Sequence, residues 1–341
     1  MRFSYFPVVF CLVLAACGGG GGGGGSGGDN GDVSGGGGGS AQIANTPLVL
    51  TSVNYEPVSQ AVVGNMNGLL ALSSSSSSLL TGVAMETPPA WMPALLSQVK
   101  NIKTWTVGNT AVLSGVEMSM SEACPYGGTI NATENDANNN DELDAGDSAS
   151  ISFANCAISS TERVSGNMSF VVNSFTDGFY SAADISLTLN NFSVVSGNTS
   201  ATGAGDMRLR FQESSTNTTY TISSSSLRST TSVSGVIKNT NMTGVSMTLN
   251  DSNTSNDQLT FAATLALSSF GNQLVVLTTT SPWLTRNGTS YPYAGQMLIT
   301  GQAGSKIRIT AVSSSNVRLE LDGTGDGVYE ESKVVTWASL Q

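Results

Sequence analysis

Two loops rich in Asp and Asn contain the residue types that bind Ca²⁺. Hard oxygen ligands at alternate positions let a single turn of chain wrap around the ion. If Asp136 is position 1 of such a loop, position 6 is Asp141 where Gly is expected, and position 12 is Asp where Glu is expected. A solvated hairpin turn is the alternative, because Asp and Asn favour turns. The candidate metal ligands are Asp136, Asn138, Asn140, Glu142, Asp144 and Asp147.

The second acidic loop follows the pattern Asp-Gly-Thr-Gly-Asp-Gly near the C-terminus. Gly327 occupies position 6, as calcium loops require, but Lys333 stands where the bidentate acid belongs. Asp-Gly between two strand patterns is also a turn signal without any metal. Ca²⁺ is the only cofactor that the sequence suggests. The candidate ligands in this loop are Asp322, Thr324, Asp326 and Glu330.

The composition excludes several kinds of chemistry. The chain has no histidine, so it contains neither a Ser-His-Asp triad nor a Cys-His pair. Its 13 basic and 24 acidic residues give a net charge of −11, and the bases are mostly scattered. Nucleic acid is therefore not an expected partner, because phosphate binding needs clustered Lys and Arg. No catalytic residues are assigned, and we expect a protein that is not an enzyme.

The first 16 residues have the anatomy of a secretory signal peptide. Arg2 provides the positive start, Phe6 to Leu14 form a short apolar region, and Ala15 and Ala16 are small residues. This apolar region is too short to span a bilayer. The sequence therefore predicts export.

The tetrapeptide Leu14-Ala15-Ala16-Cys17 resembles the lipobox of bacterial lipoproteins. In that family the cysteine is lipidated, with palmitate among its acyl groups, and becomes the mature N-terminus. The resemblance implies that Cys17 anchors the protein to a membrane. Gly18 stands where an Asp resembles an inner-membrane retention signal, which implies the bacterial outer membrane, with the body facing either the periplasm or the surface.

Residues 17–44 are expected to form a lipidated tether. Positions 18–40 are almost all Gly and Ser, and such a tract buries too little apolar surface to fold. Its root-mean-square reach is about 25–30 Å.

Two of the four cysteines remain for pairing in the mature chain. Cys11 leaves with the signal peptide, and Cys17 carries the lipid. In an exported protein, Cys124 and Cys156 are expected to form a disulfide, and two free thiols are the alternative.

Hydrophobic periodicity predicts a mainly β protein with two short N-terminal helices. Residues 45–104 form the helical part, because apolar residues recur every three or four positions in 54–72, and 89–103 opens with prolines. Residues 105–341 form an antiparallel β domain, a large sheet that is curved or sandwich-like. Clear alternation of apolar and polar residues occurs at 207–212, 245–250, 261–267, 306–310 and 317–322.

Two segments are similar to parts of uncharacterised β-rich lipoproteins of proteobacteria. They are residues 122–156, with a Cys at each end of an Asp/Asn-rich turn, and the C-terminal VRLELDGTGDGVYEESKVVTWASL. The resemblance implies a shared architecture and no particular activity.

We therefore expect an outer-membrane-anchored lipoprotein with a non-enzymatic binding or scaffolding role. The expected partner is an envelope protein, a polysaccharide or a surface ligand. A carrier of lipid or another apolar ligand is the first alternative, because a curved sheet with helices across one face suits it. A periplasmic hydrolase is the second.

Overall fold

The computed structural model describes the greater part of the chain beyond the N-terminal region. The described residues are 46–70, 118–140, 144–157, 160–176, 182–233, 236–252, 256–286, 289 and 291–340. They belong to one compact unit, Ala44–Gln341. The signal peptide, Cys17, the tether and the helix expected at 89–103 lie outside the described residues. None of the described helices has the length and apolar character needed to cross a membrane.

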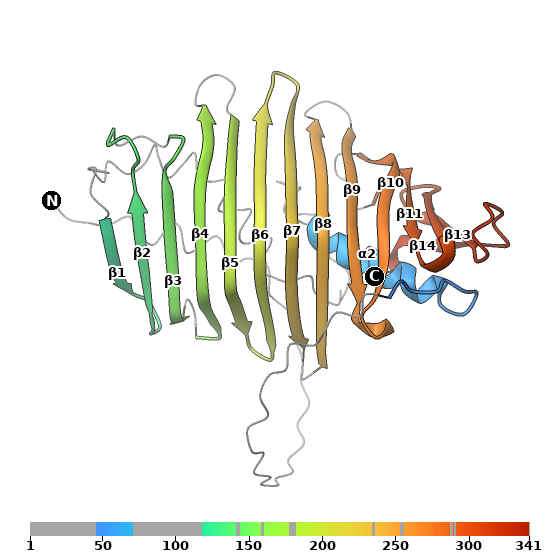
Figure 1. The fold of residues 1–341 in the computed structure, drawn as a ribbon, viewed down its shortest axis with the longest axis horizontal. Coiled ribbons are helices and arrows are strands. Elements are labelled where there is room, and N and C mark those ends of the chain that lie inside the picture. Colours follow the sequence, from blue (N-terminus) through green and yellow to red (C-terminus); the bar gives the residue numbers. More distant parts are fainter. Residues whose placement is uncertain are drawn as a thin grey trace, which may run out of the picture. The chain divides into compact units, whose positions relative to one another are not determined.

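The described strands form one antiparallel sheet of 14 strands, and every strand lies beside its neighbours in the sequence. The strands are long in the middle of the sheet and shorter towards both ends (Figure 1). The prediction of a mainly β protein with a large antiparallel sheet is therefore confirmed. The strands are β1 (Met118–Ala123), β2 (Thr129–Asn135), β3 (Ser148–Ala157), β4 (Glu162–Thr176), β5 (Ala182–Ser196), β6 (Thr199–Glu213), β7 (Asn217–Val233), β8 (Val236–Ser252), β9 (Asn256–Leu267), β10 (Gln273–Arg286), β11 (Ala294–Thr300), β12 (Lys306–Ala311), β13 (Asn316–Asp322) and β14 (Glu331–Thr336).

Alternation of side chains gives the sheet two chemically different faces. In β5, Ile185, Leu187 and Leu189 are at most 3% exposed. Ser186 and Thr188 lie between them and point to the other side, because successive side chains in a strand point to opposite faces. We call the side of Ile185 the inner face and the side of Ser186 the outer face. The alternation read from the sequence in β6, β8, β9, β12 and β13 places its apolar residues on the inner face.

At two places, a glycine with a positive φ approaches the backbone of an Asn that also has a positive φ. Gly166 in β4 has φ +100°, and Asn191 in the neighbouring β5 has φ +49°. A Cβ atom on Gly166 would lie 2.2 Å from the carbonyl oxygen of Asn191, so only glycine fits there. Gly128 stands in the same relation to Asn155, which has φ +49°. The approach of Gly166 to Asn191 accompanies a register shift between β4 and β5, and Asn155 lies at the register shift between β3 and β4.

The segment that precedes the helix is hydrogen-bonded to the C-terminal part of the sheet. The Leu48 amide donates to the carbonyl oxygen of Leu274 in β10 at 2.9 Å. The Gln302 amide donates to the carbonyl oxygen of Leu48 at 2.7 Å. Leu48 and Leu50 are 4% and 1% exposed, so this segment contributes to the core.

The one described α-helix, α2 (Tyr55–Leu70), agrees with the helix expected at 54–72. The Asn54 side chain orders the entry to it, because Oδ1 accepts from the Thr51 amide and Nδ2 donates to the Val49 carbonyl. Val58 and Val62 are fully buried, and the helix contacts β12 and β13. Figure 1 draws α2 in blue near the C-terminal strands.

Three short 3₁₀ helices complete the described structure. They are η2 (Ser268–Phe270), η3 (Gln302–Gly304) and η4 (Trp337–Leu340). Trp337 of η4 contacts Trp283 of β10 edge-to-face, with ring centroids 5.4 Å apart. Lys333 of β14 forms an ion pair with Glu56 of α2 at 2.7 Å. The helix, η4 and the C-terminal strands therefore share one core.

Candidate functional site

The first predicted calcium loop, Asp136–Asp147, is held by its own hydrogen bonds in the described positions. Asp147 is 5% exposed and accepts from the amides of Ala137, at 2.9 Å, and Asp144, at 2.6 Å. Asp136 accepts from the amides of Asn138, at 3.1 Å, and Asn139, at 2.8 Å. Glu142 lies outside the described residues.

The amide side chains of this loop face a carboxylate through their nitrogen atoms. Nδ2 of Asn138 donates to Asp144 Oδ2 at 2.8 Å, and Nδ2 of Asn140 donates to the same oxygen. A calcium ion would instead require the amide oxygens of both residues to face it, beside the carboxylate. The metal assignment for this loop stays a prediction.

The second predicted loop brings three of its four candidate ligands together. Carboxylate oxygens of Asp322, Asp326 and Glu330 all lie within 4.8 Å of one another, as a cation site would require. Asp322 is fully buried, and the amides of Gly325 and Gly327 donate to it at 2.6 and 2.9 Å.

The fourth candidate, Thr324, takes part in the same network. Its hydroxyl donates to Glu330 at 3.0 Å, and the Gly323 amide donates to the other oxygen of Glu330 at 2.9 Å. The Gly323 hydrogen bond is the main reason that the pKa of Glu330 lies below its usual value. Calcium binding here also stays a prediction.

The predicted disulfide between Cys124 and Cys156 is confirmed, with a Cα–Cα distance of 5.4 Å. It links the residue that follows β1 to the far end of β3. Two backbone hydrogen bonds flank it, from Tyr126 to the Ala157 carbonyl at 3.0 Å and from Ala157 to the Gly127 carbonyl at 2.7 Å. The disulfide therefore fastens the β1–β2 hairpin to the third strand.

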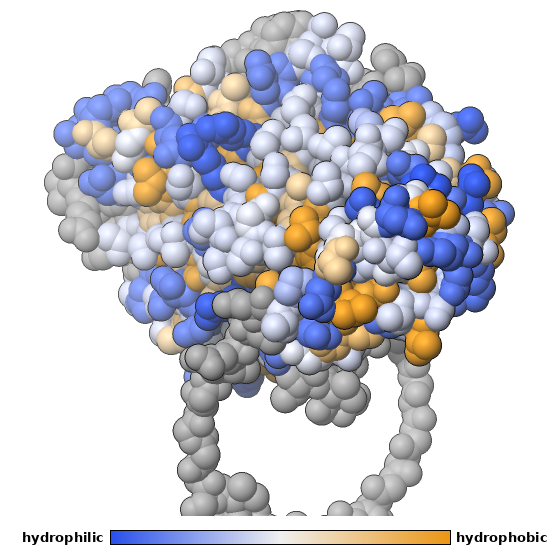
Figure 2. Space-filling model, turned by 45° about the vertical axis from the view of Figure 1, so that its right-hand side comes forward, coloured by the Kyte–Doolittle hydropathy of each residue, from blue (hydrophilic) through white to orange (hydrophobic). Residues whose placement is uncertain are grey.

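The outer face of β4–β9 is largely polar, and Val171 and Val195, which are 44% and 39% exposed, are apolar residues that also lie on it. One row of directly opposed residues crosses these six strands: Ser174, Asp184, Arg210, Thr221, Thr248 and Thr260. We call the outward-facing side chains of β4–β9 the outer polar face. In the view of Figure 2, pale and blue residues cover most of the described surface, with orange residues in small groups.

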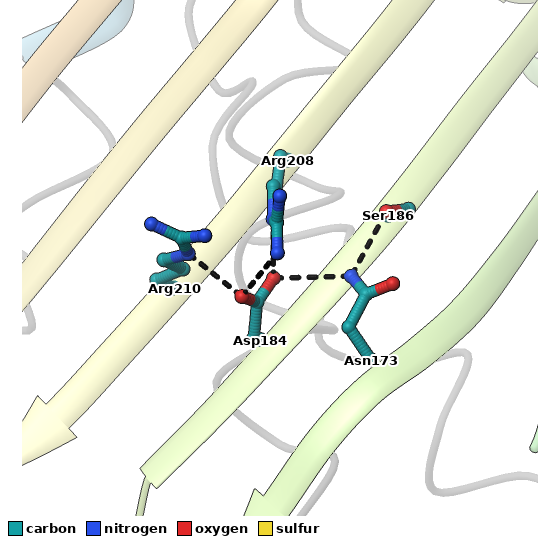
Figure 3. Close-up of polar contacts among 5 residues, drawn as sticks. All are labelled: Asn173, Asp184, Ser186, Arg208 and Arg210. Atoms are coloured by element: carbon teal, nitrogen blue, oxygen red, sulfur yellow. Dashed lines mark hydrogen bonds and ion pairs between the residues drawn. The ribbon is translucent and has the colours of Figure 1, made fainter. Parts of the chain in front are cut away.

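A charged cluster lies within the outer polar face, where β4, β5 and β6 are side by side (Figure 3). Arg208 donates to Asp184 through Nε at 2.7 Å and through a terminal nitrogen at 2.8 Å. Arg210 donates to the same carboxylate through Nε at 2.7 Å. Asn173 donates to both Asp184, at 3.0 Å, and Ser186, at 2.9 Å.

The two arginines keep Asp184 ionised. Its side chain is 14% exposed, whereas those of Arg208 and Arg210 are 46% and 53% exposed. The hydrogen bonds from Arg208 are the largest cause that lowers the pKa of Asp184 to about 2. Two guanidinium groups are thereby held in fixed positions at the surface.

A hollow of about 480 Å³ lies beside this cluster. Six outward-facing side chains form its walls: Ser186, Thr188, Asp206, Arg208, Ser223 and Ser225. The intervening residues Leu187, Met207 and Ser224 have buried side chains that point the other way, so their backbone forms the floor. The hollow is therefore open, and its walls are rich in hydroxyl groups.

Asp206 is held in one wall of the hollow by a β-bulge. The Ser225 amide and hydroxyl donate to it at 3.1 and 2.6 Å, and the Ser226 amide donates at 3.3 Å. Burial alone would raise the pKa of Asp206, but these hydrogen bonds outweigh it and lower the pKa.

The sequence pattern was not interpreted as a site at this cluster, although the spacing of its two arginines could have indicated one. Arg208 and Arg210 are two residues apart on an alternating strand, so both must point to one face. Their partner Asp184 is 24 and 26 residues away, and its position depends on the register of β5 against β6.

No protein-family model, curated protein or solved structure matches the chain.

Proposed function

We propose that the protein is a lipid-anchored, non-enzymatic binding or scaffolding protein of the bacterial envelope, and that the outer polar face is its contact surface. The observation that carries this proposal is the row of Ser, Asp, Arg and Thr side chains that crosses six neighbouring strands. At about 4.8 Å between strands, that row spans roughly 24 Å.

The dimensions of these strands suit a rigid contact surface. The strands β4–β9 contain 12 to 17 residues, which corresponds to about 40–55 Å of extended chain. Their backbone groups are hydrogen-bonded to neighbours on both sides. A surface of this kind keeps its side chains in place before a partner arrives, which reduces the entropy lost on binding.

The chemistry of the face favours a hydrophilic partner. Stable protein interfaces have an apolar, aromatic-rich core. The row across the outer polar face instead presents hydroxyl groups, one carboxylate and one guanidinium group. An envelope polysaccharide or the polar surface of an envelope protein fits these groups.

Site-specific photo-cross-linking tests the contact surface. A photo-reactive amino acid is placed at Thr188, Ser246 or Gln258, which are exposed outward positions of β5, β8 and β9. Val53 and Val328, which are 85% and 62% exposed and lie outside this face, are the control positions. We expect cross-linked envelope material from the three outer positions only. Equal yields from all five positions would refute the proposal.

The anchor in this proposal is Cys17, followed by the tether over 17–44. The resemblance of residues 14–17 to a lipobox supports it. The variant C17A should remain soluble after cell lysis and lose labelled palmitate, whereas C11A should stay in the outer-membrane fraction. If the C17A variant still associated with the membrane, the proposed lipid anchor at Cys17 would be wrong.

Protease treatment of intact and permeabilised cells decides which side of the membrane the body faces. Cleavage only after permeabilisation would place it in the periplasm and favour envelope scaffolding. Cleavage in intact cells would place it on the surface and favour adhesion.

Two finer expectations about the fold belong to this proposal as well. They are a second helix over residues 89–103 and a sheet that is curved or sandwich-like.

Lipid carriage and hydrolysis remain the two alternative functions. Retention of a fatty acid by the purified protein would favour the first, and turnover of an envelope substrate would favour the second.

A further inference from the structure

We infer that the hollow between β5, β6 and β7 binds an uncharged oligosaccharide, an inference that rests on the outer polar face being the contact surface. The hollow offers about 480 Å³ of space, and the outward-facing residues that line it are all polar or charged. Its walls carry four hydroxyl groups, one carboxylate and one guanidinium group: Ser186, Thr188, Ser223, Ser225, Asp206 and Arg208.

The charges in and beside the hollow are already balanced. Asp184 and Asp206 provide two negative charges, and Arg208 and Arg210 provide two positive charges. Asp184 joins both arginines, and bulge amides and a hydroxyl hold Asp206. A ligand with a net charge would disturb this balance, whereas an uncharged ligand leaves it intact. The net charge of −11 on the whole chain also repels anions.

Hydrogen-bonding capacity remains for a ligand with many hydroxyl groups. The hydroxyls of Thr188 and Ser223 make no hydrogen bond within the described part of the chain. Arg210 bonds Asp184 through Nε alone, and its two terminal nitrogens bond none of the described residues. A sugar hydroxyl both donates and accepts, so it can bond a Ser or Thr hydroxyl, a carboxylate or a guanidinium group.

The geometry of the sheet suits a chain of sugar rings better than a single one. Adjacent strands lie about 4.8 Å apart, which is close to the length of one ring in an extended oligosaccharide. Beyond the hollow, the row that contains Arg208 and Ser223 continues to Ser246 on β8. The parallel row beside it carries Thr221, Thr248 and Thr260 on β7, β8 and β9. The hollow would therefore hold one or two rings, and the neighbouring hydroxyl-bearing strands would contact the next ones.

Saturation-transfer NMR with full-length protein in mild detergent tests the inference. The probes are maltohexaose and a hexamer of β-1,4-linked N-acetylglucosamine, which are uncharged, and a hexamer of galacturonate, which is anionic. We expect saturation transfer to at least one uncharged probe, unchanged in high salt. Two variants should weaken it: T188V, which removes one hydroxyl, by about threefold, and S223L, which fills the hollow, by about tenfold or more.

The matched control is T278V, which makes the same change on β10. Thr278 is exposed and is opposite Leu298 of β11, outside the hollow. This variant should bind like the native protein. The inference is overturned if neither uncharged probe binds, if T188V and S223L both bind like T278V, or if only the galacturonate probe binds and does so in a salt-dependent way. Cross-linking to an envelope component from Ser246 and Gln258 would in those cases leave the proposed function standing.

Discussion

Arg208 contacts Asp184 through two parallel hydrogen bonds, of 2.7 and 2.8 Å, across the β5–β6 pair. The bidentate contact fixes a guanidinium group at the wall of the hollow. Arg210 shares the same carboxylate, so one acid holds two neighbouring bases in place. The arrangement of the outer polar face therefore depends on this carboxylate.

Replacing Asp184 with Asn should destabilise the protein in a pH-dependent way. Near pH 7 we expect a loss of about 1 kcal/mol, because both guanidinium groups are partly exposed and lose their shared partner. An unfolded Asp has a pKa of about 3.9, and in the folded protein the pKa of Asp184 is about 2. The stabilisation is therefore complete above about pH 4 and is lost as the pH falls towards 2.

Urea unfolding of the native protein and D184N between pH 7 and pH 2 measures this effect. The two should converge at the acid end. The double variant D184N/R210Q serves as a control, because it removes the repulsion between the two arginines and should recover part of the loss. A difference that stays constant down to pH 2 would contradict the role given to Asp184.

Reduction of the Cys124–Cys156 disulfide should loosen one edge of the sheet. The sequence separation of 32 residues corresponds to about 3.5–4 kcal/mol in the chain-entropy model. Hydrogen exchange should accelerate first in β1 and β2, because the bond fastens this hairpin to β3. The double variant C124S/C156S should behave like the reduced native protein. Uniform acceleration across the whole sheet would show that the bond does not act locally.

Replacing Gly166 with Ala should cost more stability than the same change at Gly244. Both glycines have positive φ, +100° and +59°, so both substitutions strain the backbone. A Cβ at Gly166 would also meet the Asn191 carbonyl oxygen at 2.2 Å, whereas nothing lies within 4 Å at Gly244. Thermal unfolding should show a difference of about 2 kcal/mol or more between the two variants. Equal losses would mean that the close approach at the bulge is unimportant.

Millimolar calcium should stabilise the protein through the loop 322–330. Three carboxylates converge there within 4.8 Å, and a bound cation would raise the free energy of unfolding by about 1–3 kcal/mol. The part of the rise that comes from this loop should disappear in D326N, which changes an exposed ligand and leaves the buried Asp322 intact. D136N tests the other predicted loop independently. An unfolding midpoint that is the same in calcium and in chelator would refute both calcium predictions.

The fold class could be predicted because burial follows the alternation of residue types. In β12 and β13, Ile307, Ile309, Leu319 and Leu321 alternate with polar residues, and all four are at most 3% exposed. The disulfide could be predicted because only Cys124 and Cys156 remained once Cys11 and Cys17 were assigned to the expected leader and the expected lipid anchor. Local pattern and simple elimination were sufficient in these cases.

The site depends on strand register, which the sequence pattern does not specify. Arg210 is opposite Asp184 only because β5 and β6 shift register between Leu189 and Phe192. A one-residue difference would turn one partner to the other face. The grouping of Asp322, Asp326 and Glu330 was easier to predict, because all three belong to one short loop.

The central claim is that the outer polar face is the surface through which this protein binds an envelope component. Photo-cross-linking in intact cells from Thr188, compared with Val53, tests it most directly. Thr188 lies on the outer face of β5, and Val53 is 85% exposed just before α2. We predict a discrete cross-linked product from Thr188 and none from Val53. The same product from both positions, or no product from Thr188, would contradict the account.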